Sequence, residues 1–138
     1  MTRTLLIIDD NKSVRDSLRF LLQHRGYEVL VAENGPQGIA IAGQSHVDGA
    51  LVDVNMPGMN GIEVCRLLLQ QARTTGKEIA VWMMTGARTP AVEKLAAEAG
   101  ALTLMAKPFD FAALYRRFEE RWDKLQLRPA APDVLDEL

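Results

Sequence analysis

Five short apolar runs, each followed by a segment with helical periodicity, constrain the fold of this chain most strongly. The runs are residues 4–8, 28–32, 47–52, 79–84 and about 101–106. Continuous apolar runs of this length are typical of strands that are covered on both faces, as in parallel sheets. Between them, apolar residues recur at three- and four-residue steps, as on one face of a helix. The alternation predicts a single doubly wound parallel sheet of the α/β class, with helices on both sides.

Capping residues predict where the helices begin and end. Asn60 and Asp110 are expected N-caps, because their side chains can accept hydrogen bonds from the first turn of a helix. Pro90 suits a helix start, where its missing N–H costs nothing. Gly26 and Gly100 are expected to follow the ends of the first and fourth helices.

The apolar faces of these helices predict the core. In the first helix, one face is shared by Val14, Leu18, Leu21 and Leu22. In the fourth, the residues expected to point inward are Val92, Leu95, Ala96 and Ala99. The last helix carries a longer apolar stripe, made of Phe111, Leu114, Phe118, Trp122 and Leu125. We interpret this stripe as core packing rather than as a cofactor site.

Composition and charge exclude several function classes. The chain has 138 residues and a net charge of −2 with both signs mixed, so a basic field for direct nucleic-acid binding is absent. A single cysteine, Cys65, excludes an internal disulfide and fits a reducing compartment, and we expect it to be buried in a helix. The first apolar run is too short for a signal peptide or a membrane span, which predicts a cytoplasmic protein.

The chain is expected to form one folded domain followed by a short tail. Residues 1–126 contain all five apolar runs and the helical segments between them. Residues 127–138 differ in character, because they include the linker-like stretch Arg128-Pro129-Ala130-Ala131-Pro132 and then acidic residues.

Polar side chains follow or end four of the five apolar runs: Asp9 and Asp10, Asp53, Thr85, and Lys107. In open α/β sheets, ligands bind at the carboxyl ends of the strands, so these side chains are expected to meet there. Three neighbouring carboxylates repel one another unless a cation lies between them, and hard oxygen ligands suit Mg²⁺. An aspartate can take a phosphoryl group to form an acyl phosphate, and Asp53 is the candidate nucleophile because it ends a central strand.

Two other classes of protein would use parts of this pattern. A Mg²⁺-dependent phosphohydrolase with an aspartate nucleophile typically has a second acid two residues further on, where this chain has Asn55. An FMN carrier needs a hydroxyl-rich phosphate loop after the first strand, where Asp9 and Asp10 would repel the phosphate. His24 and His46 lie among polar residues and are expected on the surface, and no His/Cys cluster indicates zinc.

The ordered set resembles the receiver domain of two-component response regulators, the CheY-like family. The shared pattern comprises Asp9-Asp10, Asp53 followed by Met56-Pro57-Gly58, then Thr85, then Lys107-Pro108-Phe109, and the likeness covers residues 3 to about 126. The resemblance implies a flavodoxin-like sheet of strand order 2-1-3-4-5 and a receiver domain at residues 1–126. It also implies a signalling module that catalyses only its own phosphorylation and dephosphorylation, not an enzyme acting on other substrates.

By position, the resemblance assigns a role to each polar residue. Asp53 would accept a phosphoryl group from the phosphohistidine of a histidine kinase or a histidine phosphotransfer protein. Asp10 would ligate Mg²⁺ directly, Asp9 mainly through water, and Asp53 and the backbone carbonyl of Asn55 would complete the protein ligands. Thr85 and Lys107 would contact the phosphoryl oxygens.

The resemblance also implies how a signal would leave the site. Output would pass through protein contacts of the face formed by the fourth helix, the fifth strand and the fifth helix, with a phosphorylation-linked dimer as one candidate assembly. The chain departs from the family at Leu104, where receivers usually carry a tyrosine or phenylalanine. We therefore expect a smaller, loop-centred change at residues 85–92. The pattern leaves open whether the receiver stands alone or belongs to a larger regulator or hybrid kinase.

Overall fold

The computed structural model describes residues 2–127 and divides into two compact units, one ending at Pro108 and the other beginning at Phe109. Strands and helices alternate through the first unit: β1 (Thr4–Ile8), α1 (Lys12–His24), β2 (Glu28–Ala32), α2 (Gly35–Gln44), β3 (Gly49–Asp53), α3 (Gly61–Thr74), β4 (Ala80–Thr85), α4 (Pro90–Ala99) and β5 (Thr103–Ala106). The second unit holds α5 (Phe111–Leu127). The tail expected at residues 127–138 lies outside the described residues, apart from Leu127 at the end of α5.

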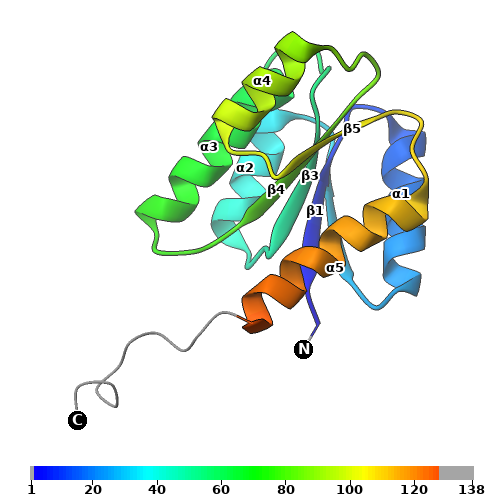
Figure 1. Cartoon of the computed structure of the whole chain (residues 1–138). Coiled ribbons are helices and arrows are strands. Elements are labelled where there is room, and N and C mark those ends of the chain that lie inside the picture. Colours follow the sequence, from blue (N-terminus) through cyan, green and yellow to red (C-terminus); the bar gives the residue numbers. More distant parts are fainter. Residues whose placement is uncertain (1, 128–138) are drawn as a thin grey trace. The chain divides into compact units, whose positions relative to one another are not determined.

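The five strands form one parallel sheet of order β2-β1-β3-β4-β5, as predicted. Within the first unit, α1 lies on one side of the sheet, and α2, α3 and α4 lie together on the other (Figure 1). β3 is the middle strand, between β1 and β4. This order places the carboxyl ends of β1, β3, β4 and β5 side by side at one edge.

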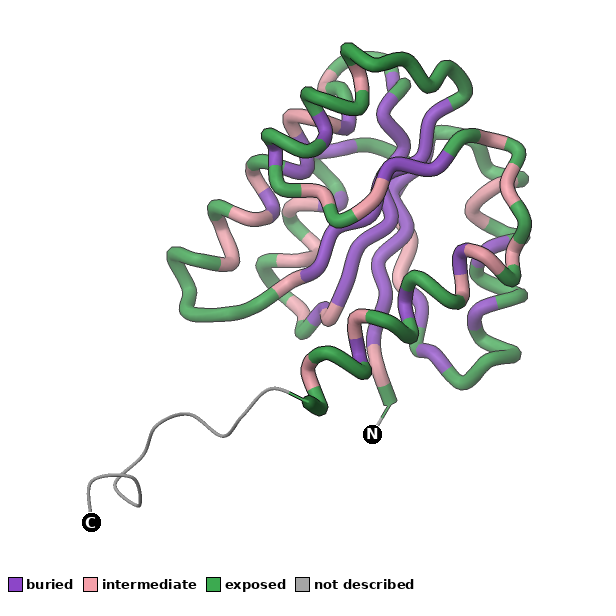
Figure 2. The backbone as a smooth tube through the Cα atoms, in the orientation of Figure 1, coloured by how far each residue is buried: buried purple, intermediate pink, exposed green. Residues whose placement is uncertain are grey.

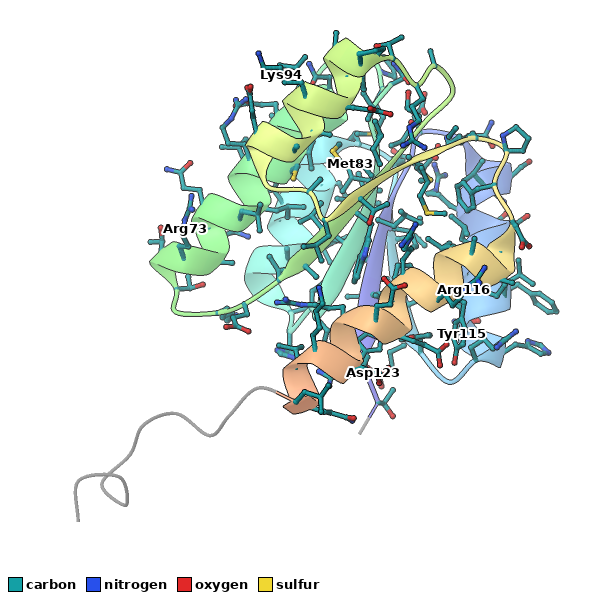
Figure 3. The ribbon with its side chains drawn as sticks, viewed as in Figure 1. Arg73, Met83, Lys94, Tyr115, Arg116 and Asp123 are labelled. Atoms are coloured by element: carbon teal, nitrogen blue, oxygen red, sulfur yellow. The ribbon has the colours of Figure 1, made fainter. Side chains whose placement is uncertain are left out.

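The three inner strands carry the core of the first unit. Every residue of β1, β3 and β4 is buried, and Figure 2 shows the strands as a buried centre between more exposed helices. Met83, labelled in Figure 3, has no exposed surface. Trp82 is 1% exposed, and its ring needs the space beside Gly49, because a Cβ there would lie 2.5 Å from the ring. Burial on both faces explains why these strands read as continuous apolar runs.

The expected helix boundaries are confirmed. The Asn60 side chain accepts a hydrogen bond from the Glu63 N–H at 3.1 Å, and the Asp110 side chain accepts one from the Ala112 N–H at 3.2 Å. Gly100 follows α4 with φ +101°, a left-handed conformation that glycine adopts without strain. Cys65 is fully buried in α3, and burial raises the pKa of its thiol to about 11.

The prediction that Leu21 and Leu95 point inward is wrong. Leu21 is 38% exposed and Leu95 is 47% exposed. In α1 the buried contacts are made by Leu18 and Leu22, one turn apart, and Leu21 lies at the edge of their stripe. In α4 the expected burial of Ala96 and Ala99 is confirmed, whereas Leu95 lies on the solvent side of the same helix.

Strand limits differ by one or two residues from those expected. β3 begins at Gly49 rather than residue 47, and β4 covers Ala80–Thr85 rather than 79–84. β5 begins at Thr103 rather than at residue 101, because the Ala101 N–H bonds to the Ala96 carbonyl and so closes the end of α4. Among the described residues, no helix combines the length and the apolar character needed to cross a membrane.

Candidate functional site

The carboxyl edge of the sheet brings three carboxylates together. Asp53 is the last residue of β3 and is 4% exposed, Asp9 directly follows β1 and has no exposed surface, and Asp10 is exposed. One oxygen of each lies within 4.8 Å of the others. The two buried carboxylates are adjacent because β1 and β3 are paired along their length, with Ile8 opposite Val52.

Lys107 supplies the positive charge of this cluster. Its Nζ lies 2.8 Å from Asp9 Oδ2 and 3.4 Å from Asp53 Oδ2. The residue is held in place by its own backbone, since its N–H bonds to the carbonyl of Thr85 at 2.7 Å. The ammonium group therefore lies beside both buried carboxylates, although Lys107 follows β5, an edge strand of the sheet.

The electrostatics of the cluster favour a bound cation. Burial raises the pKa of Asp53 and the charge of Asp9 raises it further, against the opposing effects of the Asn55 N–H and Lys107. Burial lowers the pKa of Lys107, but its hydrogen bond to Asp9 and the charges of Asp9 and Asp53 outweigh burial and leave that pKa raised. Three carboxylates and one ammonium give the site a negative charge that a divalent ion would relieve.

The three aspartates fit a magnesium ion. One oxygen of each aspartate lies within 4.8 Å of the others, and carboxylate oxygens are the ligands that Mg²⁺ prefers, so these residues would hold the ion. Asp9 is already engaged, because Oδ2 contacts Lys107 and Oδ1 accepts from the Asn11 N–H at 2.8 Å. Asp10 is the most solvent-exposed of the three carboxylates.

Thr85 and Asn55 form a contact that the sequence did not indicate. The Thr85 hydroxyl donates to the side-chain oxygen of Asn55 at 2.8 Å, and the Thr85 oxygen accepts from the Ala87 N–H at 3.1 Å. The Asn55 N–H donates to Asp53 Oδ1 at 3.1 Å. The sequence did not predict this contact with Thr85, because a linear pattern does not show which way an amide side chain turns.

Two further residues support the site without having been predicted. A Cβ at Gly61 would overlap the carbonyl oxygen of Asp53, so α3 begins against the backbone of the residue that carries the central carboxylate. The Gly61 N–H also donates to the Val54 carbonyl at 2.9 Å. On the other side, the Arg15 guanidinium donates to the backbone carbonyl of Asp9 at 2.7 Å. A glycine at the start of a helix could have indicated the close approach of Gly61 to Asp53, whereas no feature of the sequence indicated the contact of Arg15 with Asp9.

Comparison with known proteins agrees with this geometry. The family model described as "Response regulator receiver domain" matches residues 5–119. This chain belongs to the response regulator receiver domain family. The match spans every residue of the acidic cluster, together with Thr85 and Lys107.

The receiver is similar to several curated response regulators. It is 35% identical over 130 residues to "Response regulator MprA" of Mycobacterium sp. (strain KMS), covering 94% of this chain and 52% of that protein. The same name and identity apply to a relative in Mycobacterium leprae (strain TN), with 53% of that protein covered. The chain therefore spans about half the length of these relatives.

Solved structures show the same fold for the receiver. The chemotaxis protein CheY4 of Vibrio cholerae matches with a TM-score of 0.80 and 28% identity, covering 87% of this chain and 98% of that one. A CheY-like receiver domain protein from Methanospirillum hungatei JF-1 matches with a TM-score of 0.84 and 25% identity, covering 91% and 98%. The CheY-like fold class and the strand order 2-1-3-4-5 are thereby confirmed.

Proposed function

We propose that this receiver is a phosphorylation-activated signalling module in which Asp53 is the phosphoacceptor. The phosphoryl donor is the phosphohistidine of a histidine kinase or a histidine phosphotransfer protein. The observation that carries the proposal is the position of Lys107 Nζ, 3.4 Å from Asp53 Oδ2 and 2.8 Å from Asp9 Oδ2, at the ends of neighbouring strands. An ammonium group fixed there can neutralise a phosphoryl oxygen as soon as one arrives.

The proposed transfer is a displacement at phosphorus. An Asp53 carboxylate oxygen attacks the phosphorus atom, the P–N bond to the donor imidazole breaks, and the imidazole leaves and takes up a proton. The product is an aspartyl phosphate, which water later hydrolyses to phosphate and the free carboxylate. Lys107 and the Thr85 hydroxyl contact phosphoryl oxygens in the product state. The protein acts on its own side chain and is not an enzyme for other substrates.

We assign Asp9, Asp10, Asp53 and the backbone carbonyl of Asn55 as the groups that would hold Mg²⁺. When bound, the ion supplies positive charge that offsets the phosphoryl oxygens and the carboxylates. Asp10 is the direct ligand and Asp9 acts mainly through water, which suits the engagement of both Asp9 oxygens by protein donors.

Output is proposed to pass through protein contacts of α4, β5 and α5. In the first unit, a surface hollow of about 270 Å³ lies between α4 and β5, and Leu104 is among its lining residues. Leu102 is 52% exposed beside it, and on α4 Lys94 has a side chain that is 78% exposed and points outward in Figure 3. Mixed apolar and charged groups suit a protein partner rather than nucleic acid, or a second copy in a phosphorylation-linked dimer. The greater length of the relatives supports a place within a larger regulator.

The phosphoacceptor is tested by chemical phosphorylation. The protein is incubated with acetyl phosphate or phosphoramidate in Mg²⁺, and its intact mass is measured with and without EDTA. We expect one phosphoryl adduct in the wild type and in the control Asp48→Asn, and none in Asp53→Asn or in EDTA. An adduct that persists in Asp53→Asn, or that forms equally well in EDTA, would refute the assignment.

A further inference from the structure

The single proton of the Thr85 hydroxyl is already donated to a protein acceptor in this structure. Thr85 has no exposed surface, its hydroxyl donates to Asn55 Oδ1 at 2.8 Å, and its oxygen accepts from the Ala87 N–H at 3.1 Å. A threonine hydroxyl has one proton to donate. Thr85 therefore cannot donate to a phosphoryl oxygen while it donates to Asn55.

We propose that the side chain of Asn55 is a latch that competes with the phosphoryl group for the Thr85 hydroxyl and so sets the threshold for switching. The inference rests on the proposed function, since it concerns the same site, and makes Asn55 a positioning residue. While the latch is closed, Thr85 is held away from the phosphoryl position. Phosphorylation must supply a better acceptor than the amide oxygen before the hydroxyl turns toward Asp53.

The backbone of Asn55 and its side chain have separate partners. The Asn55 N–H donates to Asp53 Oδ1 at 3.1 Å, whereas the amide oxygen reaches a residue thirty positions away on β4. Removing the side chain therefore leaves the backbone contact to Asp53 in place. Asn55 thus contacts both the phosphoacceptor Asp53 and the Thr85 hydroxyl, so phosphorylation of Asp53 can change the hydrogen bond of Thr85 through Asn55.

The segment after β4 is exposed, and Arg88 within it is paired with Glu93 of α4. Gly86, Ala87 and Arg88 are all exposed, and a Cβ at Gly86 would meet nothing within 4 Å. The backbone carbonyl of Thr85 stays bound to the Lys107 N–H, so the strand end itself is fixed. Opening the latch rotates the Thr85 side chain, which takes its oxygen away from the Ala87 N–H and releases the loop at that point.

The latch is tested by a double-mutant cycle of Asn55→Ala and Thr85→Val. The first readout is the affinity for beryllofluoride, a phosphoryl mimic, measured by calorimetry in saturating Mg²⁺, with the Mg²⁺ affinity of each variant measured separately. The second is the amide NMR signal of Ala87 in the metal-free protein. Because one neutral hydrogen bond is removed from the resting state only, we expect Asn55→Ala to bind beryllofluoride about 3- to 10-fold more tightly.

The cycle separates a latch from a general structural effect. In the Thr85→Val background, Asn55→Ala should change the beryllofluoride affinity by less than about 1.5-fold. In the Thr85→Ser background, which keeps the hydroxyl, Asn55→Ala should again tighten beryllofluoride binding as it does in the wild type. The Ala87 signal should move in Asn55→Ala and not move further in the double variant. Weaker or unchanged binding in Asn55→Ala, an equal gain in both backgrounds, or an unmoved Ala87 signal would overturn the latch. A wild type that binds no beryllofluoride would overturn the proposed function and the latch with it.

Discussion

Replacing Asp53 by asparagine should stabilise the metal-free protein, although it removes the proposed phosphoacceptor. Asp53 is 4% exposed, and its pKa is raised because burial and the charge of Asp9 both disfavour the ionised form. Asparagine keeps the size of the side chain and an oxygen that can accept from the Asn55 N–H. The substitution therefore removes a buried charge that lowers the stability of the folded state.

The magnitude depends mainly on the burial of the Asp53 carboxylate. At an effective dielectric constant of about 20, the repulsion by Asp9 across up to 4.8 Å is about 3.5 kcal/mol and the attraction by Lys107 at 3.4 Å is about 5 kcal/mol, so the two pair energies largely cancel. The cost of burying the charge, the first cause of the raised pKa, therefore decides the sign, and the expected gain in the free energy of unfolding is about 1–2 kcal/mol. For a domain of this size, the melting temperature should rise by about 4–8 °C.

The gain should depend on pH with a definite sign. Between the ordinary pKa of 3.8 and the raised pKa of Asp53, the folded state holds a proton that the unfolded state has released, so stability falls as pH rises through this window. The advantage of Asp53→Asn is therefore complete above the raised pKa and shrinks as pH falls toward 3.8.

The assay is thermal or urea unfolding of both proteins in EDTA and in Mg²⁺. Mg²⁺ should stabilise the wild type by about 1.4 kcal/mol at ten times its dissociation constant and the variant by less, because one ligand is lost. Asp48→Asn is the control, since Asp48 accepts from the Thr4 N–H at 2.8 Å and lies 3.7 Å from Arg3, so removing its charge should not stabilise. A less stable Asp53→Asn in EDTA, or equal Mg²⁺ effects in both proteins, would refute the reasoning.

Two further predictions concern the supports of the site. Gly61→Ala should lower the free energy of unfolding, measured in urea, by about 1–3 kcal/mol, because the new Cβ would overlap the backbone of Asp53. In the control Gly86→Ala the new Cβ would meet nothing within 4 Å, so this variant should not be destabilised. Equal effects of the two substitutions would contradict the close packing at Gly61. Asp10→Asn should weaken Mg²⁺ binding more than Asp9→Asn in an NMR titration, because a direct ligand loses more on removal than one acting through water, and equal losses would contradict the assigned roles.

The sequence alone predicted the fold class and which acidic, hydroxyl and lysine side chains would lie at the carboxyl edge of the sheet. Alternating apolar runs and helical segments predicted the parallel sheet, because burial on both faces leaves a continuous apolar pattern that few other folds produce. Residues that end such runs must lie at the carboxyl edge of the sheet, so Asp53, Thr85 and Lys107 could be placed together before any distance was known. Leu21 and Leu95 show the limit of the same reasoning, since periodicity gives a face of a helix but not how far its neighbours cover it.

The tertiary structure decided how these side chains are connected. Lys107 Nζ lies 2.8 Å from Asp9 Oδ2 and 3.4 Å from Asp53 Oδ2, and the Thr85 hydroxyl donates to Asn55 Oδ1. Neither choice of partner could be predicted from residue type or spacing. Each contact depends on which side chains are buried and on the rotamers that packing between distant segments of the chain allows. The sequence thus determined which groups meet at the carboxyl edge of the sheet, and only the folded structure decided which of them form hydrogen bonds and ion pairs with one another.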